Sequence, residues 1–189
     1  MDISLTQKLR QKMGNRPRTR GRYHSSELYF INKGLTTPEE WFTPREKETK
    51  EMLKMWSGIG MHNQLEDLLG KENSEQKKEI SYKGLVLVGK VDFMPPDSPD
   101  ELWEFKTSEK LMKTSKPWHD YQVKLYCTMF GKKRGMVLQP VQTSDGIYLK
   151  HLKTIERDDE WFKKELESLY VFHEAVEKLW IKKGLTNSK

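Results

Sequence analysis

The stretch that decides the fold runs from Gly84 to Ser108, with GLVLVGKVDF at 84–93, MPPDSPD at 94–100 and ELWEFKTS at 101–108. The outer segments have the β-branched and aromatic content of strands, and the proline-rich segment between them cannot continue either strand. Because side chains alternate along a strand, Glu104 and Lys106 share one face. If the two strands form a hairpin, Asp92 joins them there. The stretch then outlines a metal site with a lysine beside it.

The composition is that of a single folded domain with charged, helical flanks. The chain has 189 residues, of which 35% are hydrophobic and 33% charged, and its net charge of +6 favours polyanionic partners only mildly. One cysteine, Cys127, excludes an intramolecular disulfide and any multi-cysteine zinc or iron–sulfur site within the chain. No apolar run approaches the roughly 20 residues of a membrane helix. We therefore expect an intracellular protein that does not enter a membrane, and the sequence does not distinguish the cytoplasm from a mitochondrion or nucleoid.

The chain divides into two predicted regions. Residues 1–22 form a basic N-terminal arm with seven Lys and Arg residues. Such a charge cluster is either a solvated tail or an arm that contacts phosphates, and the sequence does not separate the two. Residues 23–189 form one domain.

Three capping signals predict helices in the first third of that domain. Ser25 or Ser26 caps a short helix closed by residues 33–34, and Thr37 caps a second helix. A third, longer helix begins at Thr43 and reaches Leu69. Glycines at 58 and 60 indicate either a break in it or the close approach of another backbone. Its expected packed stripe is Leu53, Trp56, Ile59, Gly60, Leu65, Leu68 and Leu69.

The remaining chain predicts strands alternating with helices. After a polar connector at 71–78, the expected elements are strands at 79–93 and 102–107, a lysine-rich loop at 107–118, a helix at 120–129, strands at 136–140 and 147–152, and a long amphipathic helix at 158–183. This order predicts an α/β or α+β fold, with a central mixed sheet flanked by helices, a helical N-terminal part and a long C-terminal helix.

Four short motifs follow one another in the middle of the chain: His62 on the third helix, GKVD ending at Asp92, EFK containing Glu104 and Lys106, and QVKLY containing Gln122 and Tyr126. Each has an ordinary structural explanation when taken singly, such as a turn aspartate or a surface ion pair. In this order they resemble the PD-(D/E)XK nuclease superfamily. The similarity is to its RecB-like branch, which includes the CRISPR-associated RecB-like nucleases and the mitochondrial genome-maintenance exonucleases. The resemblance covers about residues 56–130 and implies a restriction-endonuclease-like core.

The resemblance implies a metal site for phosphodiester hydrolysis. Asp92 and Glu104 would supply carboxylate oxygens, the backbone carbonyl of Phe105 a third oxygen, and His62 an imidazole. Hard oxygen ligands with one imidazole suit Mg²⁺ or Mn²⁺. Lys106 would hold the attacking water or stabilise the charge that develops on the phosphate.

Support for DNA is expected from the following helix and loop. By the family motif, Gln122 and Tyr126 would orient DNA, and the Tyr126 ring could stack with a base. The alternative for this pair is anchoring the helix against the sheet. Lys110 and Lys113, with Lys116 after them, form either a basic rim for the DNA backbone or a solvated loop.

The chain departs from several RecB-like relatives, which hold an iron–sulfur cluster through four cysteines. Since Cys127 is the only cysteine, we expect no iron–sulfur cluster, and we expect Cys127 to be a buried apolar residue.

The resulting hypothesis is a metal-dependent deoxyribonuclease, an exonuclease on single-stranded or end-containing DNA. A non-catalytic nucleic-acid-binding module with the same fold is the alternative, and an interaction scaffold built on the terminal helix is a third. The sequence leaves the oligomeric state open.

Overall fold

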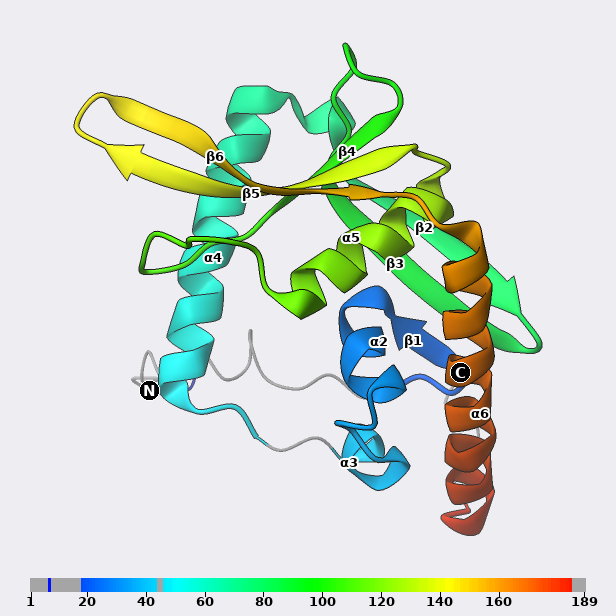
Figure 1. Ribbon diagram of the computed structural model, residues 1–189. Helices are drawn as coiled ribbons and strands as arrows, with labels where there is room; N and C mark the ends of the chain where they lie inside the picture. Colours follow the sequence, from blue (N-terminus) through cyan, green and yellow to red (C-terminus); the bar gives the residue numbers. More distant parts are fainter. Residues whose placement is uncertain (1–6, 8–17, 44–45, 185–189) are drawn as a thin grey trace.

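The structure, a computed structural model, describes residue 7, residues 18–43 and residues 46–184. Figure 1 shows one sheet with helices packed around it. The elements are β1 (Arg22–His24), α2 (Ser25–Asn32), α3 (Pro38–Phe42), α4 (Thr49–Leu69), a short 3-10 turn (Lys71–Asn73), β2 (Ser74–Tyr82), β3 (Leu85–Phe93), β4 (Glu101–Phe105), α5 (Pro117–Phe130), β5 (Arg134–Thr143), β6 (Gly146–Glu156) and α6 (Asp159–Lys182).

The six-stranded sheet has the order β1-β3-β4-β5-β6, with β2 paired to β3. The strand β3 is antiparallel to β2 and β4, and β4 is parallel to β5 because α5 provides the crossover between them. The β3–β4 register pairs Phe93 with Trp103. In an antiparallel pair this register sets Asp92 opposite Glu104. The hairpin geometry expected from the sequence is therefore present.

Two hydrophobic clusters lie on opposite faces of the sheet. The larger one joins the sheet to α2, α5 and α6, with Leu102 among its members, and these helices lie below the sheet in Figure 1. The smaller one joins Leu65 of α4 to Phe93, Phe105 and Leu138. Because Leu102 and Phe105 alternate along β4, α4 packs against the face opposite to α5. Glu104, the predicted acid on β4, therefore lies in the sheet between the layer of α2, α5 and α6 and the layer of α4.

The mixed α/β fold predicted from the sequence is confirmed, as are several element ends. Thr37 caps α3, and its hydroxyl accepts a hydrogen bond from the Glu40 amide at 3.2 Å. Helix α5 ends at Gly131, which has the left-handed φ of 71° that the C-terminal position requires. The long helix α6 begins after its cap, Asp158.

The start of α4 was predicted wrongly. The helix begins at Thr49 with Glu48 as its N-cap, and Thr43 instead ends α3, while residues 44–45 lie outside the described residues. Its glycines do not break it. A Cβ on Gly58 would lie 2.9 Å from Thr107 Oγ1, so the close approach comes from a side chain rather than from a backbone.

The packed stripe predicted for α4 is also wrong in most of its members. Only Met52 and Leu65 are buried among the described residues of the helix. The helix packs on the sheet through Leu65, with Met61 and Leu69 beside it, whereas the apolar positions of the first half other than Met52 stay at the surface. The exposed members of the predicted stripe are Leu53, Trp56, Ile59, Gly60 and Leu68.

Two further boundaries differ from prediction. The expected strand at 79–93 is a hairpin, because residues 83–84 form a turn, with Gly84 at a φ of 84°, and the polar connector supplies the start of β2. Ser25 does not cap α2. His24 is the N-cap, and the Ser25 hydroxyl donates to Tyr126 Oη at 2.9 Å.

The described end of the predicted arm is tied to the domain. Arg18 lies over the ring of Trp41, 4.7 Å from its centroid, and Arg20 pairs with Glu177 at 2.6 Å. Arg22 opens β1. Residues 1–6 and 8–17 of the arm lie outside the described residues, so the arm and its boundary at residue 22 stay predictions. Across the described residues, no helix has the length and apolar character needed to cross a membrane.

Gly89 fixes the distance between β3 and α5. A Cβ on Gly89 would lie 2.8 Å from the Met129 methyl and 3.0 Å from the Tyr126 ring, which is held in place by its hydrogen bonds. We expect Gly89→Ala to destabilise the protein by about 1–3 kcal/mol through overpacking. The measurement is urea unfolding followed by circular dichroism.

Gly60 provides the control, because a Cβ at this helical position meets nothing within 4 Å. Gly60→Ala is expected to stabilise the protein by about 0.5–1 kcal/mol. Equal effects at the two glycines would show that Gly89 does not limit the spacing of β3 and α5.

Candidate active site

The acidic pair sits where β3 and β4 run side by side. Asp92 lies one residue before the end of β3, and its Oδ2 accepts a hydrogen bond from the Phe105 amide at 2.7 Å. This bond ties the end of β3 to β4 and brings the Phe105 backbone next to the carboxylate. Glu104 is buried, with 3% of its surface exposed. Both predicted acids therefore meet at one point of the sheet.

Lys106 follows β4 directly and points toward α5. Its Nζ donates to Glu104 Oε1 at 2.7 Å and to Gln122 Oε1 at 2.9 Å. The side chain is 17% exposed, so the ammonium group is fixed by its partners at the border of the protein interior. The shared face of Glu104 and Lys106 that strand alternation predicted is confirmed.

His62 reaches the acidic pair from the other layer. Its Nδ1 lies 3.4 Å from Asp92 Oδ1, and its ring meets Phe105 edge to face. Burial lowers the pKa of His62, but the hydrogen bond and the negative charge of Asp92 outweigh burial and leave that pKa raised. The helix α4 thus contributes an imidazole that contacts the carboxylate of β3.

A hydrogen-bonded chain connects α2 to the site. The Ser25 hydroxyl donates to Tyr126 Oη at 2.9 Å, Gln122 Nε2 donates to the same oxygen at 2.8 Å, and Gln122 Oε1 accepts from Lys106. Tyr126 is only 2% exposed. The base-stacking role suggested for the Tyr126 ring does not fit this burial, and the anchoring alternative does.

Tyr126→Phe tests this anchoring role. Removing the hydroxyl leaves the buried donor of Ser25 and the half-buried donor of Gln122 without this acceptor, so we expect a loss of stability of about 1–2 kcal/mol. DNA affinity should stay unchanged, because the ring is not accessible to a base. Thermal melting and binding of labelled DNA check both expectations, and a large affinity loss with unchanged melting would restore the stacking role.

Glu104 has an environment that suits a cation. Burial and, second, the charge of Asp92 raise the pKa of Glu104 to about 7, against the opposing effect of Lys106. Its Oε2 is buried with no hydrogen-bond partner among the described residues. A positive ion near Oε2 would satisfy this oxygen and relieve the repulsion between the two acids.

The donor set fits a hard divalent ion such as Mg²⁺ or Mn²⁺, with Asp92 and Glu104 as oxygen donors and His62 as the imidazole. In the described part of the chain, however, no three His, Cys, Asp or Glu side chains are already spaced as a metal cage. Asp92 and His62 contact each other instead. The predicted ligands are therefore adjacent, but Asp92 is already held by its contacts with His62 and with the Phe105 backbone amide.

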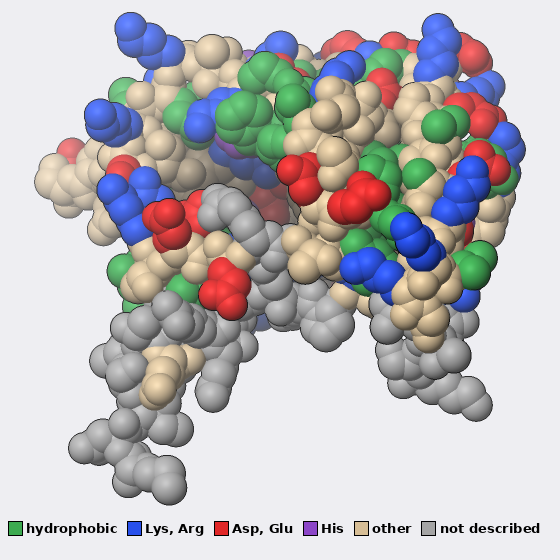
Figure 2. All heavy atoms as spheres, turned by 90° about the horizontal axis from the view of Figure 1, so that it is seen from below, with side chains coloured by type: hydrophobic (Ala, Val, Ile, Leu, Met, Phe, Trp, Pro, Cys, Tyr) green, Lys and Arg blue, Asp and Glu red, His purple; other side chains and the backbone are tan. Residues whose placement is uncertain are grey.

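The predicted basic rim lies partly beside α4. Lys110 lines a pocket of about 430 Å³ between the loop after β4 and α4, together with Lys54, Gly58 and Thr107. Lys113 is exposed on the same loop. Figure 2, which views the molecule from below, shows a hollow with acidic and histidine side chains inside it and Lys and Arg side chains near its edge.

Two residues near the site were not predicted from the sequence. Glu66 lies one turn after His62 on α4, and its pKa is raised by burial and by Glu75, with a smaller effect of Asp92. His119 lies one turn before Gln122 on α5, and its Nδ1 is buried without a partner among the described residues. Their helical spacing from His62 and Gln122 was the signal that could have identified them.

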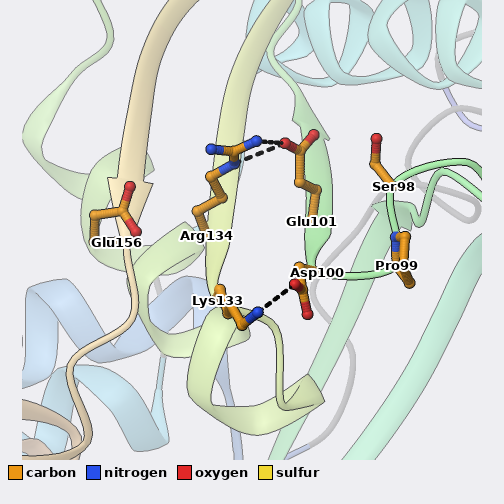
Figure 3. A pocket seen from close by; sticks show the side chains of 7 residues that line it. All are labelled: Ser98, Pro99, Asp100, Glu101, Lys133, Arg134 and Glu156. Carbon is orange, nitrogen blue, oxygen red and sulfur yellow. Dashed lines mark hydrogen bonds and ion pairs between the residues drawn. The ribbon is translucent and has the colours of Figure 1, made fainter.

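Other polar features give no sign of a reaction. Cys127 is fully buried, and burial raises the pKa of its thiol to about 12, so the expectation of a buried apolar residue is confirmed. A pocket of about 450 Å³ at the start of β4 and β5 holds two ion pairs, Arg134 with Glu101 and Lys133 with Asp100 (Figure 3). These charges neutralise one another.

Comparison with known proteins adds evidence on the fold. No protein-family model matches the chain, and no curated protein matches it. Solved structures do. The alkaline exonuclease of Laribacter hongkongensis matches with a TM-score of 0.55 at 15% identity, over 87% of this chain and 94% of that one. A phage-related exonuclease of Haemophilus somnus matches with a TM-score of 0.53 at 12% identity, over 86% of this chain and 96% of that one. The protein SSO0001 matches with a TM-score of 0.60 at 18% identity, over 88% of this chain and 83% of that one. The chain therefore has the fold of the Laribacter and Haemophilus exonucleases.

Proposed function

We propose that the protein is a divalent-metal-dependent deoxyribonuclease that hydrolyses phosphodiester bonds, acting as an exonuclease on single-stranded or end-containing DNA. The observation that carries the proposal is that four side chains meet at one point. Asp92 lies opposite Glu104, Lys106 donates a hydrogen bond to Glu104, and His62 contacts the Asp92 carboxylate. The fold shared with two exonucleases supports it. The structure of the Laribacter enzyme in complex with dAMP supports DNA as the substrate class.

Each side chain has a distinct part in this proposal. Asp92, Glu104 and His62, with the Phe105 carbonyl, would hold Mg²⁺ or Mn²⁺. Such an ion supplies positive charge beside the phosphate and makes water a better nucleophile at neutral pH. Hydrolysis adds water across a P–O bond, so the attacking water loses a proton and the leaving oxygen gains one. Lys106, fixed by Glu104 and Gln122, orients the attacking water and stabilises the charge that builds on the phosphate.

A substrate panel tests the proposal. Labelled linear and circular DNA, each single- and double-stranded, are incubated with the protein and Mg²⁺ or Mn²⁺ and separated on a gel. The expected result is loss of the linear substrates, with circular DNA resistant. Cleavage of circular single strands would replace exonuclease with endonuclease action. Binding without cleavage under every divalent metal would favour the non-catalytic module.

A further inference from the structure

An aromatic surface joins α2 to the first turn of α5. The rings of Phe30 and Trp118 have centroids 6.2 Å apart, and Tyr29 contacts both. Tyr121 lies beneath, 5.6 Å from Tyr29. Phe30 and Trp118 each keep 37% of their surface exposed. Packing α2 against α5 explains Tyr121, which is buried, but not the two rings left open to solvent. We call Phe30 and Trp118 the aromatic platform.

One positive charge lies over the platform. Lys116 Nζ lies 5.0 Å from the centroid of the Trp118 ring. Within the described ranges, no carboxylate forms an ion pair with Lys116. This exposed ammonium group is therefore available to a phosphate, and it stands directly over an aromatic face.

The platform is continuous with the candidate active site through His119. The ring of His119 lies 5.6 Å from that of Trp118, and His119 precedes Gln122, the partner of Lys106, by one turn of α5. Burial and then the charges of Lys106 and Lys116 lower the pKa of His119 to about 4. The same imidazole is thus close to both ammonium groups.

We propose that the aromatic platform and Lys116 bind a nucleotide of single-stranded DNA next to the cleaved bond, its base stacked on Trp118 and Phe30 and its phosphate on Lys116. The inference rests on the proposed function for its location beside a cleaved bond. Every base has a face that stacks, so such a surface accepts any sequence. Bases of a duplex are already stacked on their neighbours, so the platform selects single strands or frayed ends.

The test uses oligo(dT) and an oligonucleotide of equal length with abasic sugars, each fluorescently labelled. Binding is measured by anisotropy in EDTA, so no cleavage is needed. Trp118→Ala is expected to weaken oligo(dT) binding about tenfold. It should leave abasic binding unchanged, and Trp118→Phe should keep most of the affinity. Tyr148→Ala, an exposed aromatic on β6, is the control and should change neither. Equal losses on both oligonucleotides, or no loss, would overturn the proposal.

Lys116→Gln gives an independent readout that does not risk the fold, because the residue is exposed. One lost phosphate contact should reduce the salt slope of single-strand binding by about 0.7. An unchanged slope would contradict the phosphate role. If the wild type cleaves DNA but Trp118→Ala binds normally, only the platform fails. If binding depends on Trp118 but no metal supports cleavage, only the nuclease proposal fails.

Discussion

Replacing Lys106 with methionine is expected to slow DNA cleavage by about a hundredfold or more. The ammonium group donates a hydrogen bond to the buried acid Glu104, and Gln122 fixes its position from α5. Methionine keeps much of the volume of the side chain but can neither orient water nor stabilise phosphate charge. Single-turnover cleavage of labelled linear single strands measures the effect.

The matched control is Lys83→Met. Lys83 is an exposed lysine that pairs with Glu167 of α6 at 2.8 Å, away from the acidic pair. Cleavage by this variant should equal that of the wild type. Thermal melting of both variants separates loss of chemistry from loss of folding. A folded Lys106→Met variant with wild-type activity would remove Lys106 from the reaction.

Glu104→Gln is expected to change how stability depends on pH and on metal. The pKa of Glu104 is about 7 in the folded protein and 4.5 as its reference value, so its stabilising contribution is complete below pH 4.5 and is lost as pH rises through 7. At about 1.4 kcal/mol per pKa unit, the metal-free protein should lose on the order of 2–3 kcal/mol across this window. The glutamine variant lacks this loss.

Urea unfolding in EDTA at pH 5 and pH 8 measures the difference between the two proteins. Added Mg²⁺ or Mn²⁺ should then stabilise the wild type at pH 8 and have little effect on Glu104→Gln, because the ion binds the folded carboxylate. Glu101→Gln, which removes another buried acid of β4, is the control and should keep the response to metal. Equal metal responses in wild type and Glu104→Gln would show that the ion binds elsewhere.

The fold and the centre of the site were predictable because local patterns determine them. Alternation along β4 put Glu104 and Lys106 on one face, and the short proline-rich connection made a hairpin that sets Asp92 opposite Glu104. The cap at Thr37 and the stop at Gly131 likewise depend on a few neighbouring residues.

The errors concern features that depend on tertiary contacts. The apolar positions of the first half of α4 look like a packed stripe, but that half extends beyond the sheet, so Trp56 and Ile59 stay exposed. Ser25 carries the chemistry of a cap, yet its hydroxyl bonds to Tyr126 on a helix about a hundred residues later. His119 has no motif of its own; its spacing from Gln122 places it on the same side of α5, and the packing of α5 beside Lys106 brings it to the site.

The most direct test of the central claim is a cleavage time course with Asp92→Asn beside the wild type, on end-labelled linear single-stranded DNA with Mn²⁺. Asparagine can still accept the hydrogen bond from the Phe105 amide, so the hairpin should stay intact while one anionic oxygen donor is lost. The account predicts degradation by the wild type and a loss of about a hundredfold or more in the variant. Equal rates for the two proteins, or no cleavage by the wild type, would contradict it.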